Sequence, residues 1–192
     1  MPNEEHPEIQ DIDKPKELYH ASPDRNIAIF EPRAEGVRDP DEGPVVFGTP
    51  YKAYASMFLV NADDRWTSLG RYNNIWVCVI GDVEKYISRD RGGAIYKLNP
   101  KHFHSDPHRN MYEIEWVSKE PVTPQSKEEF ESGLKAMITL GVKVYVMKLE
   151  KFEEFKLLKK NQRHEEAGKI LLTLIPETLE TISRFREIKD HI

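Results

Sequence analysis

Apolar positions in the first three quarters of the chain form short runs and alternating stretches that are typical of strands. These patterns predict strands near residues 17–20, 45–48, 75–80, 94–98, 111–118 and 142–147. Residues 61–74 are polar and are expected to form a loop. Many short strands with few helices between them favour an α+β fold with mixed or antiparallel sheets.

Two helices are predicted among these strands from their start signals. Thr49 and Pro50 have the residue types of an N-cap and a first helical position, and they predict a helix over residues 51–60. Ser126 and Glu129 have the spacing of a capping box. This spacing predicts a second helix that begins at the box and ends near residue 140.

The pattern changes near Glu150, after which apolar residues recur close to helical spacing. This change predicts a helical C-terminal appendage over residues 149–192, interrupted at Pro176 and closed by a helix over Thr178–His191. The apolar face of the appendage is expected to pack on the core, on a second copy of the chain in a homodimer, or on a protein partner.

Three parts follow from this division. Residues 1–16 are polar and acidic and contain three prolines, which predicts a flexible N-terminal arm. Residues 17–148 hold the predicted strands and form the main domain. Residues 149–192 form the helical appendage.

Composition narrows the class of protein. The 28 basic and 33 acidic residues give a net charge of −5, so the chain lacks the overall basic field of many nucleic-acid-binding proteins, although a local basic groove is compatible with that total. The single cysteine, Cys78, excludes an intramolecular disulfide, fits a reducing compartment and is expected to be a buried apolar residue. No apolar run approaches the ~20 residues that cross a bilayer, and the acidic start lacks a secretion signal, so a cytoplasmic protein without membrane contact is expected.

Three segments combine residue types that carry chemistry. Tyr19-His20-Ala21-Ser22 ends the first strand, Val46-Phe47-Gly48-Thr49-Pro50 precedes a helix with Tyr51 and Tyr54, and Glu113-Ile114-Glu115-Trp116 lies on a later strand. Taken singly, each segment is compatible with a structural role. A histidine at a strand end, tyrosines on a helix and alternate glutamates on a strand are common in any core and its solvated face.

Together and in this order, the segments resemble the ADP-ribosyltransferase-like superfamily, in its diphtheria-toxin and poly(ADP-ribose) polymerase branch with a His-Tyr-Glu triad. The resemblance covers about residues 17–148 and leaves the appendage outside. It implies a split, mixed β-sheet core, NAD as the substrate, no metal, and either ADP-ribosyl transfer or NAD hydrolysis. The macromolecular target of such a transfer is not specified by the sequence.

The resemblance also implies roles for individual residues. His20 matches the first-strand histidine that hydrogen-bonds NAD, and Ala21, followed by Ser22, takes the usual glycine position whose main chain holds the carboxamide. Tyr51 or Tyr54 matches the aromatic residue that stacks on nicotinamide. The catalytic glutamate is best matched by Glu115, with Glu113 as the alternative. Cations for the pyrophosphate are offered by three arginines: Arg25, Arg33 and Arg38.

These residue types suit cleavage of the bond between nicotinamide and ribose. Positive charge develops on the ribose carbon, and a carboxylate that holds a ribose hydroxyl stabilises it. An aromatic ring fixes the leaving group, and a histidine orients the substrate by hydrogen bonds.

Two alternatives use the same fold. Branches of the superfamily have lost triad members, so a non-catalytic nucleotide- or protein-binding domain is one of them. RNA 2′-phosphotransferase activity is the other, and it relies on an arginine-rich site that the acidic balance disfavours. His102, His104 and His108 offer imidazoles for a transition metal, but their spacing follows no regular face, so a polar loop is expected there instead of a metal site.

Overall fold

The first strand lies where two small antiparallel sheets meet in the computed structural model, which describes residues 13–34, 43–105 and 113–181. Strand β1 (Leu18–Ser22) pairs with β5 (Gly93–Leu98), and β5 pairs with β7 (Ser126–Phe130). On its other side, a bridge between Tyr19 and Thr49 joins β1 to β2 (Val46–Gly48), which pairs with β6 (Trp116–Ser118). We call these two small sheets together the first sheet; the bridge gives them the order β6-β2-β1-β5-β7, in which every neighbouring pair is antiparallel.

The second sheet has the order β3-β4-β8, with β3 (Thr67–Tyr72) antiparallel and β8 (Lys143–Val146) parallel to β4 (Ile75–Ile80). The central place of β4 explains its uninterrupted apolar sequence, because helices cover both of its faces. Cys78 is 1% exposed in this strand, and burial raises the pKa of its thiol to about 12, which confirms the prediction of a buried apolar residue.

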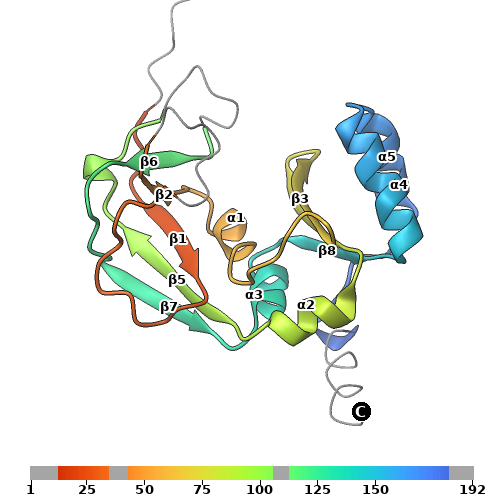
Figure 1. Ribbon diagram of the computed structural model, residues 1–192, viewed down its shortest axis with the longest axis horizontal. Coiled ribbons are helices and arrows are strands. Elements are labelled where there is room, and N and C mark those ends of the chain that lie inside the picture. The colour runs from red at the N-terminus through yellow and green to blue at the C-terminus, as the bar shows by residue number, and fades with distance from the viewer. Residues whose placement is uncertain (1–12, 35–42, 106–112, 182–192) are drawn as a thin grey trace, which may run out of the picture.

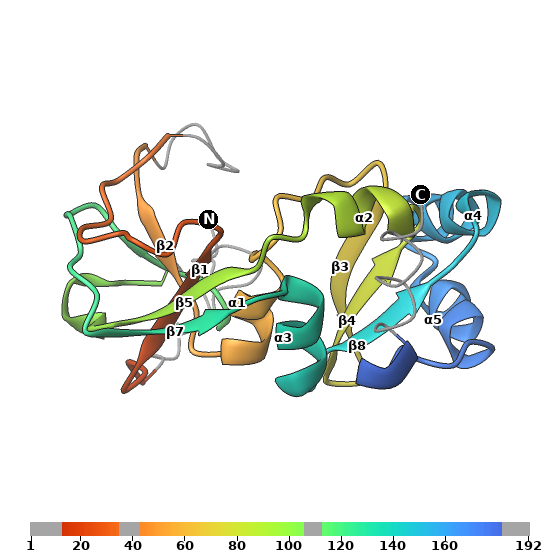
Figure 2. The same cartoon turned by 90° about the horizontal axis from the view of Figure 1, so that it is seen from below.

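Helices fill the space between the two sheets and cover the outer face of the second (Figures 1 and 2). The helices are α1 (Lys52–Ser56), α2 (Val83–Arg89), α3 (Gly133–Thr139), α4 (Leu149–Lys160) and α5 (His164–Leu172). Tyr54 and Met137, from α1 and α3, pack on Trp76 and Val144 of the second sheet. Other residues of the same two helices pack on the first sheet. The mixed sheets and helices confirm the predicted α+β class.

The C-terminal helices belong to the core of the second sheet. Phe152 and Phe155 of α4 and Ile170 of α5 are buried against Val77 and Val79 of β4. Of the three arrangements expected for the apolar face, packing on the core is the one seen within the chain. The predicted last helix lies outside the described residues beyond position 181, as does most of the N-terminal arm. None of the helices in the described ranges is long and apolar enough to cross a membrane.

The helix predicted from the capping box is wrong in its first part. Residues 126–130 form β7, because pairing with β5 outweighs the local capping signal. The helix begins only at Gly133, where Ser132 is the N-cap and accepts a hydrogen bond from the Lys135 amide at 3.2 Å. The Asp90 carboxylate adds acceptors for the Gly133 and Leu134 amides at 2.6 and 3.1 Å.

Three other boundaries differ from the predictions. The expected loop over 61–74 contains β3. Asn73 and Asn74 connect β3 to β4, and their φ values of 49° and 62° are positive, as a two-residue hairpin turn requires. The helix expected over 51–60 covers only Lys52–Ser56. Its N-cap is Tyr51, and Thr49, two residues earlier, accepts a hydrogen bond from the Tyr51 amide. The strand expected over 111–118 is β6 alone among its described residues.

Candidate functional site

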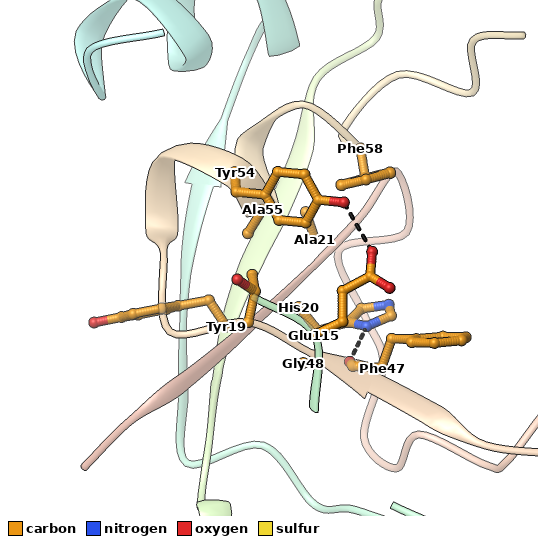
Figure 3. Close-up of a pocket in the computed structure, with 10 residues that line it drawn as sticks. Tyr19, His20, Ala21, Phe47, Gly48, Tyr54, Ala55, Phe58 and Glu115 are labelled. Atoms are coloured by element: carbon orange, nitrogen blue, oxygen red, sulfur yellow. Dashed lines mark hydrogen bonds between the residues drawn. The ribbon is translucent and has the colours of Figure 1, made fainter. Parts of the chain in front are cut away.

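A pocket of about 270 Å³ opens where β1, β2, the end of α1 and the residue before β6 meet (Figure 3). The three segments that the sequence singles out come together here, although they lie far apart along the chain. The pocket is lined by Tyr19, His20, Ala21, Phe47, Gly48, Thr49, Tyr54, Ala55, Phe58 and Glu115. His20, Tyr54 and Glu115 therefore share one cavity.

His20 is oriented by the neighbouring strand. Its Nδ1 lies 2.8 Å from the Phe47 carbonyl oxygen, and since a carbonyl only accepts, Nδ1 carries the hydrogen. Burial lowers the pKa of the imidazole, more than the hydrogen bond to Phe47 raises it, and the charge of Arg33 lowers it further. The ring is thus neutral near pH 7, and in this tautomer Nε2 is a hydrogen-bond acceptor.

Tyr54 and Glu115 form a hydrogen-bonded pair in the wall. The Tyr54 hydroxyl donates to Oε1 of Glu115 at 2.9 Å. The ring of Tyr54 is 6% exposed and packs on Trp76, with ring centroids 4.6 Å apart. Packing in the core thus fixes the Tyr54 ring, and the Tyr54 hydroxyl in turn orients the Glu115 carboxylate.

Phe58 supplies the exposed aromatic surface of the pocket, and the sequence analysis missed it. Its side chain is 42% exposed and meets Tyr54 edge to face, with centroids 5.1 Å apart and planes at 82°. Its place four residues after Tyr54 was the available signal, but α1 ends at Ser56, so helical spacing did not determine where Phe58 points.

Gly48 allows the strands behind the pocket to approach closely. A Cβ at this position would lie 3.1 Å from Cε1 of Phe103 and 3.2 Å from Cβ of Leu18. Beside it, the Tyr19 amide donates to the Thr49 carbonyl at 2.7 Å, and the Thr49 amide donates to the Tyr19 carbonyl at 3.0 Å. These contacts set the separation of β1 and β2 at the base of the cavity.

Several predicted site residues lie outside the lining. Tyr51 is partly buried and packs on Trp76, with the Arg71 guanidinium 5.7 Å from its ring centroid. Ser22 accepts a hydrogen bond from the Asp24 amide at 3.1 Å, in the turn that follows β1. Glu113 is exposed and does not contribute to the pocket.

The predicted arginines differ in position. Arg25 donates to the carbonyl oxygens of Arg91 and Phe130 at 2.7 and 3.0 Å, which makes it a structural link between loops. Arg33 is exposed, its backbone bridges Val45, and its charge acts on His20. Arg38 lies outside the described residues.

The histidine-bearing loop has structural partners. His102 Nδ1 lies 2.8 Å from a carboxylate oxygen of Glu120, and the His104 backbone pairs with Val117 of β6. His108 lies outside the described residues. Within the described ranges, no group of three or more His, Cys, Asp or Glu side chains is placed to hold a metal ion.

The chemistry of the pocket follows from its lining. A carboxylate and a neutral imidazole acceptor can bind hydroxyl groups, and Phe58 and Phe47 offer apolar surface to a ring. None of the lining residues within the described part of the chain is a lysine or arginine. The cavity therefore suits an uncharged or cationic ring with an attached sugar better than it suits a phosphate.

Comparisons of this chain with protein families, with curated proteins and with solved structures gave no match.

Proposed function

We propose that this protein binds NAD and cleaves its nicotinamide–ribose bond, either transferring ADP-ribose to an acceptor or hydrolysing NAD. The observation that carries the proposal is that His20, Tyr54 and Glu115 line one pocket. These are the residues that match the His-Tyr-Glu pattern in chain order. Their convergence is unexpected for three structural residues of unrelated strands and helices.

In this proposal the Glu115 carboxylate holds a ribose hydroxyl and stabilises the positive charge that develops on the ribose carbon. The Tyr54 hydroxyl positions that carboxylate through the 2.9 Å hydrogen bond. His20 offers Nε2 to a second hydroxyl, and the exposed ring of Phe58 packs on the nicotinamide.

The size and charge of the cavity suggest how NAD would lie. A volume of about 270 Å³ is near the lower end of ligand pockets, which run from roughly 300 to 1,000 Å³. It suits the nicotinamide and its ribose, with the pyrophosphate outside. Arg33 is exposed and close enough to His20 to lower the pKa of the imidazole, so it is the candidate cation for the phosphates.

The arrangement of strands also supports the proposal. Two small sheets enclose α1 and α3, and β1, β2 and β6 bring the three segments to one end of the first sheet. A split β-sheet core of the ADP-ribosyltransferase type is the finer fold that we propose. The described lining residues include no arginine, which disfavours the RNA 2′-phosphotransferase alternative.

NAD binding and nicotinamide release test the proposal. Calorimetry with wild-type protein is expected to give saturable NAD binding, and chromatography is expected to detect free nicotinamide over hours. Glu115→Gln keeps an acceptor for Tyr54 and should lower nicotinamide release by about 10²-fold or more. Glu113→Gln, two residues away and exposed, is the matched control and should leave release within about twofold of wild type.

The outcomes separate the alternatives. Saturable NAD binding without nicotinamide release would indicate the non-catalytic nucleotide-binding domain. Absence of NAD binding by wild-type protein would refute both uses of the pocket. Equal losses in the two glutamine variants would show that Glu115 has no special role.

A further inference from the structure

Two more hollows follow the candidate pocket, and each shares a lining residue with the hollow before it. The second, of about 390 Å³, shares Phe58 with the pocket and is lined by β3 residues 67–69. The third, of about 750 Å³, shares Lys159 with the second and is lined by β3 residues 70–72 together with residues of α5. We call the second and third hollows together the β3 trough. Strand β3 is an edge strand of its sheet, and the third hollow extends from it across β4 to Lys143 and Tyr145 of β8.

Lysines from three elements line the trough. They are Lys143 at the start of β8, Lys156 and Lys159 on α4, and Lys169 on α5, and His164 lies beside them. The acidic lining residues are Asp63, Asp64 and Glu165, of which Asp63 is already paired with Arg65 at 2.8 Å. Arg71 also lines the third hollow, but its guanidinium lies over the rings of Tyr51 and Trp76. The trough is therefore a local basic surface on a chain with net charge −5.

Two of these lysines have their charge available. Lys143 and Lys169 are exposed, and neither forms an ion pair within the described part of the chain. Lys159, by contrast, is held at the junction of the hollows, where its Nζ donates to Ser68 Oγ at 2.7 Å and to the Leu69 carbonyl at 3.1 Å. One hydrogen-bonded lysine thus lies between the two hollows, and two exposed lysines line the third.

Aromatic rings accompany the cations. Phe58 stands at the end of the trough that adjoins the candidate pocket, and the partly buried rings of Tyr72 and Tyr145 line the third hollow. The Tyr72 ring also packs on Phe155, so Phe58 is the ring most available to a ligand. Cations beside an exposed ring suit single-stranded nucleic acid, because lysines bind phosphates and a ring stacks on a base. An acidic peptide would use the lysines but gain little from the rings.

We propose that the β3 trough binds single-stranded nucleic acid, with its phosphates on Lys143, Lys159 and Lys169 and one base against Phe58 at the mouth of the candidate pocket. This proposal goes beyond the NAD reaction and rests on different residues, apart from Phe58. It places a nucleic-acid strand where an acceptor for the proposed transfer would have to lie.

Fluorescence anisotropy with a labelled twelve-nucleotide oligothymidylate tests the proposal in the absence of NAD. Wild-type protein at 50 mM salt is expected to bind the strand saturably. Lys143→Ala with Lys169→Ala should weaken binding about tenfold and reduce the slope of log Kd against log salt by about 1.4, because two phosphate contacts are lost. The matched control, Lys101→Ala with Lys119→Ala, removes the same charge from exposed lysines that line none of the three hollows and should bind as wild type does.

Competition identifies the ligand class. An unlabelled oligothymidylate should displace the labelled strand, whereas polyglutamate and duplex DNA at the same charge concentration should displace it at least tenfold less well. No saturable binding by wild type, equal losses in the two double variants, or displacement by polyglutamate at equal concentration would each overturn the proposal. Failure of NAD binding would leave this result unaffected, because the labelled-strand assay contains no NAD.

Discussion

The Tyr54 hydroxyl donates a hydrogen bond to Oε1 of Glu115 across 61 residues of sequence. The bond ties the short helix α1 to the residue that precedes β6. Because the Tyr54 ring is packed on Trp76, the carboxylate is positioned by the same core that joins α1 to the second sheet.

Tyr54→Phe tests this relationship, because it keeps the ring and removes only the hydroxyl. We expect a loss of about 0.5–1.5 kcal/mol in the free energy of unfolding, measured by urea denaturation. In the proposed reaction, nicotinamide release should fall more than NAD affinity, since the carboxylate loses its orientation. Unchanged release with a measurable loss of stability would limit the hydrogen bond to a structural role.

The pH dependence of stability is expected to report on His20. Burial lowers the pKa of its imidazole in the folded protein below the usual value of 6.5, so the unfolded chain binds more protons as the pH falls below that value. The free energy of unfolding therefore has its full value, as far as His20 is concerned, above about pH 6.5. It decreases as the pH falls toward the folded pKa of His20, by at most about 1.4 kcal/mol per pH unit.

Urea denaturation between pH 8 and pH 5 measures this slope. His20→Gln removes the titrating group and should flatten the curve relative to wild type. His102→Gln, an exposed histidine outside the pocket, serves as the comparison. A His20→Gln curve parallel to wild type would show that the buried imidazole does not contribute.

Asp90 is expected to be important for stability through its cap on α3. Its carboxylate accepts hydrogen bonds from the Gly92 and Gly133 amides at 3.1 and 2.6 Å and from the Ser132 hydroxyl at 2.6 Å. Asp90→Ala should lower the free energy of unfolding by about 2–4 kcal/mol, since it removes a cap and leaves several donors without an acceptor. Glu31→Ala, at an exposed carboxylate, should change it by less than about 0.5 kcal/mol in the same urea titration.

Gly92 and Gly43 form a matched pair of tests for backbone strain. Both have positive φ, 66° and 71°, but a Cβ on Gly92 would lie 2.0 Å from the Phe130 carbonyl oxygen, whereas a Cβ on Gly43 would meet nothing within 4 Å. Gly43→Ala should therefore cost only about 1–2 kcal/mol for the left-handed conformation. Gly92→Ala should cost more than about 4 kcal/mol, because β5 and the end of β7 must separate. Thermal melting followed by circular dichroism distinguishes the two, and equal melting temperatures would contradict this expectation.

Strong apolar patterns made most of the strands predictable. β4 is a continuous apolar run because it is buried on both faces, and the apolar residues of β1 and β5 also indicated strands. β3 was missed because Gly70, Arg71 and the two asparagines after it are polar or small, and its order comes from pairing with β4. The signal that was overlooked is the pair Asn73-Asn74, whose tolerance of positive φ suits a hairpin turn.

The same distinction applies to the candidate site. Short motifs at strand ends drew attention to His20, Tyr54 and Glu115, and the topology brings their side chains into one pocket. The choice between Tyr51 and Tyr54 required the structure, because their ring positions depend on how a five-residue helix meets Trp76. Phe58 and the β3 trough depend on contacts between elements that are distant in sequence, which local patterns do not encode.

The candidate pocket lies where two separately hydrogen-bonded strand ladders meet, and the bridge between Tyr19 and Thr49 connects them. His20 belongs to the ladder of β1, β5 and β7, whereas Phe47 and Gly48 belong to the ladder of β2 and β6. Two backbone hydrogen bonds and the bond from His20 to the Phe47 carbonyl cross the seam at this point. Breaking these three hydrogen bonds would separate the two ladders and widen the pocket opening, while the hydrogen bonds within each ladder remained. Hydrogen exchange of the Thr49 amide, which donates to the Tyr19 carbonyl, is therefore expected to report any separation of the two ladders at the pocket.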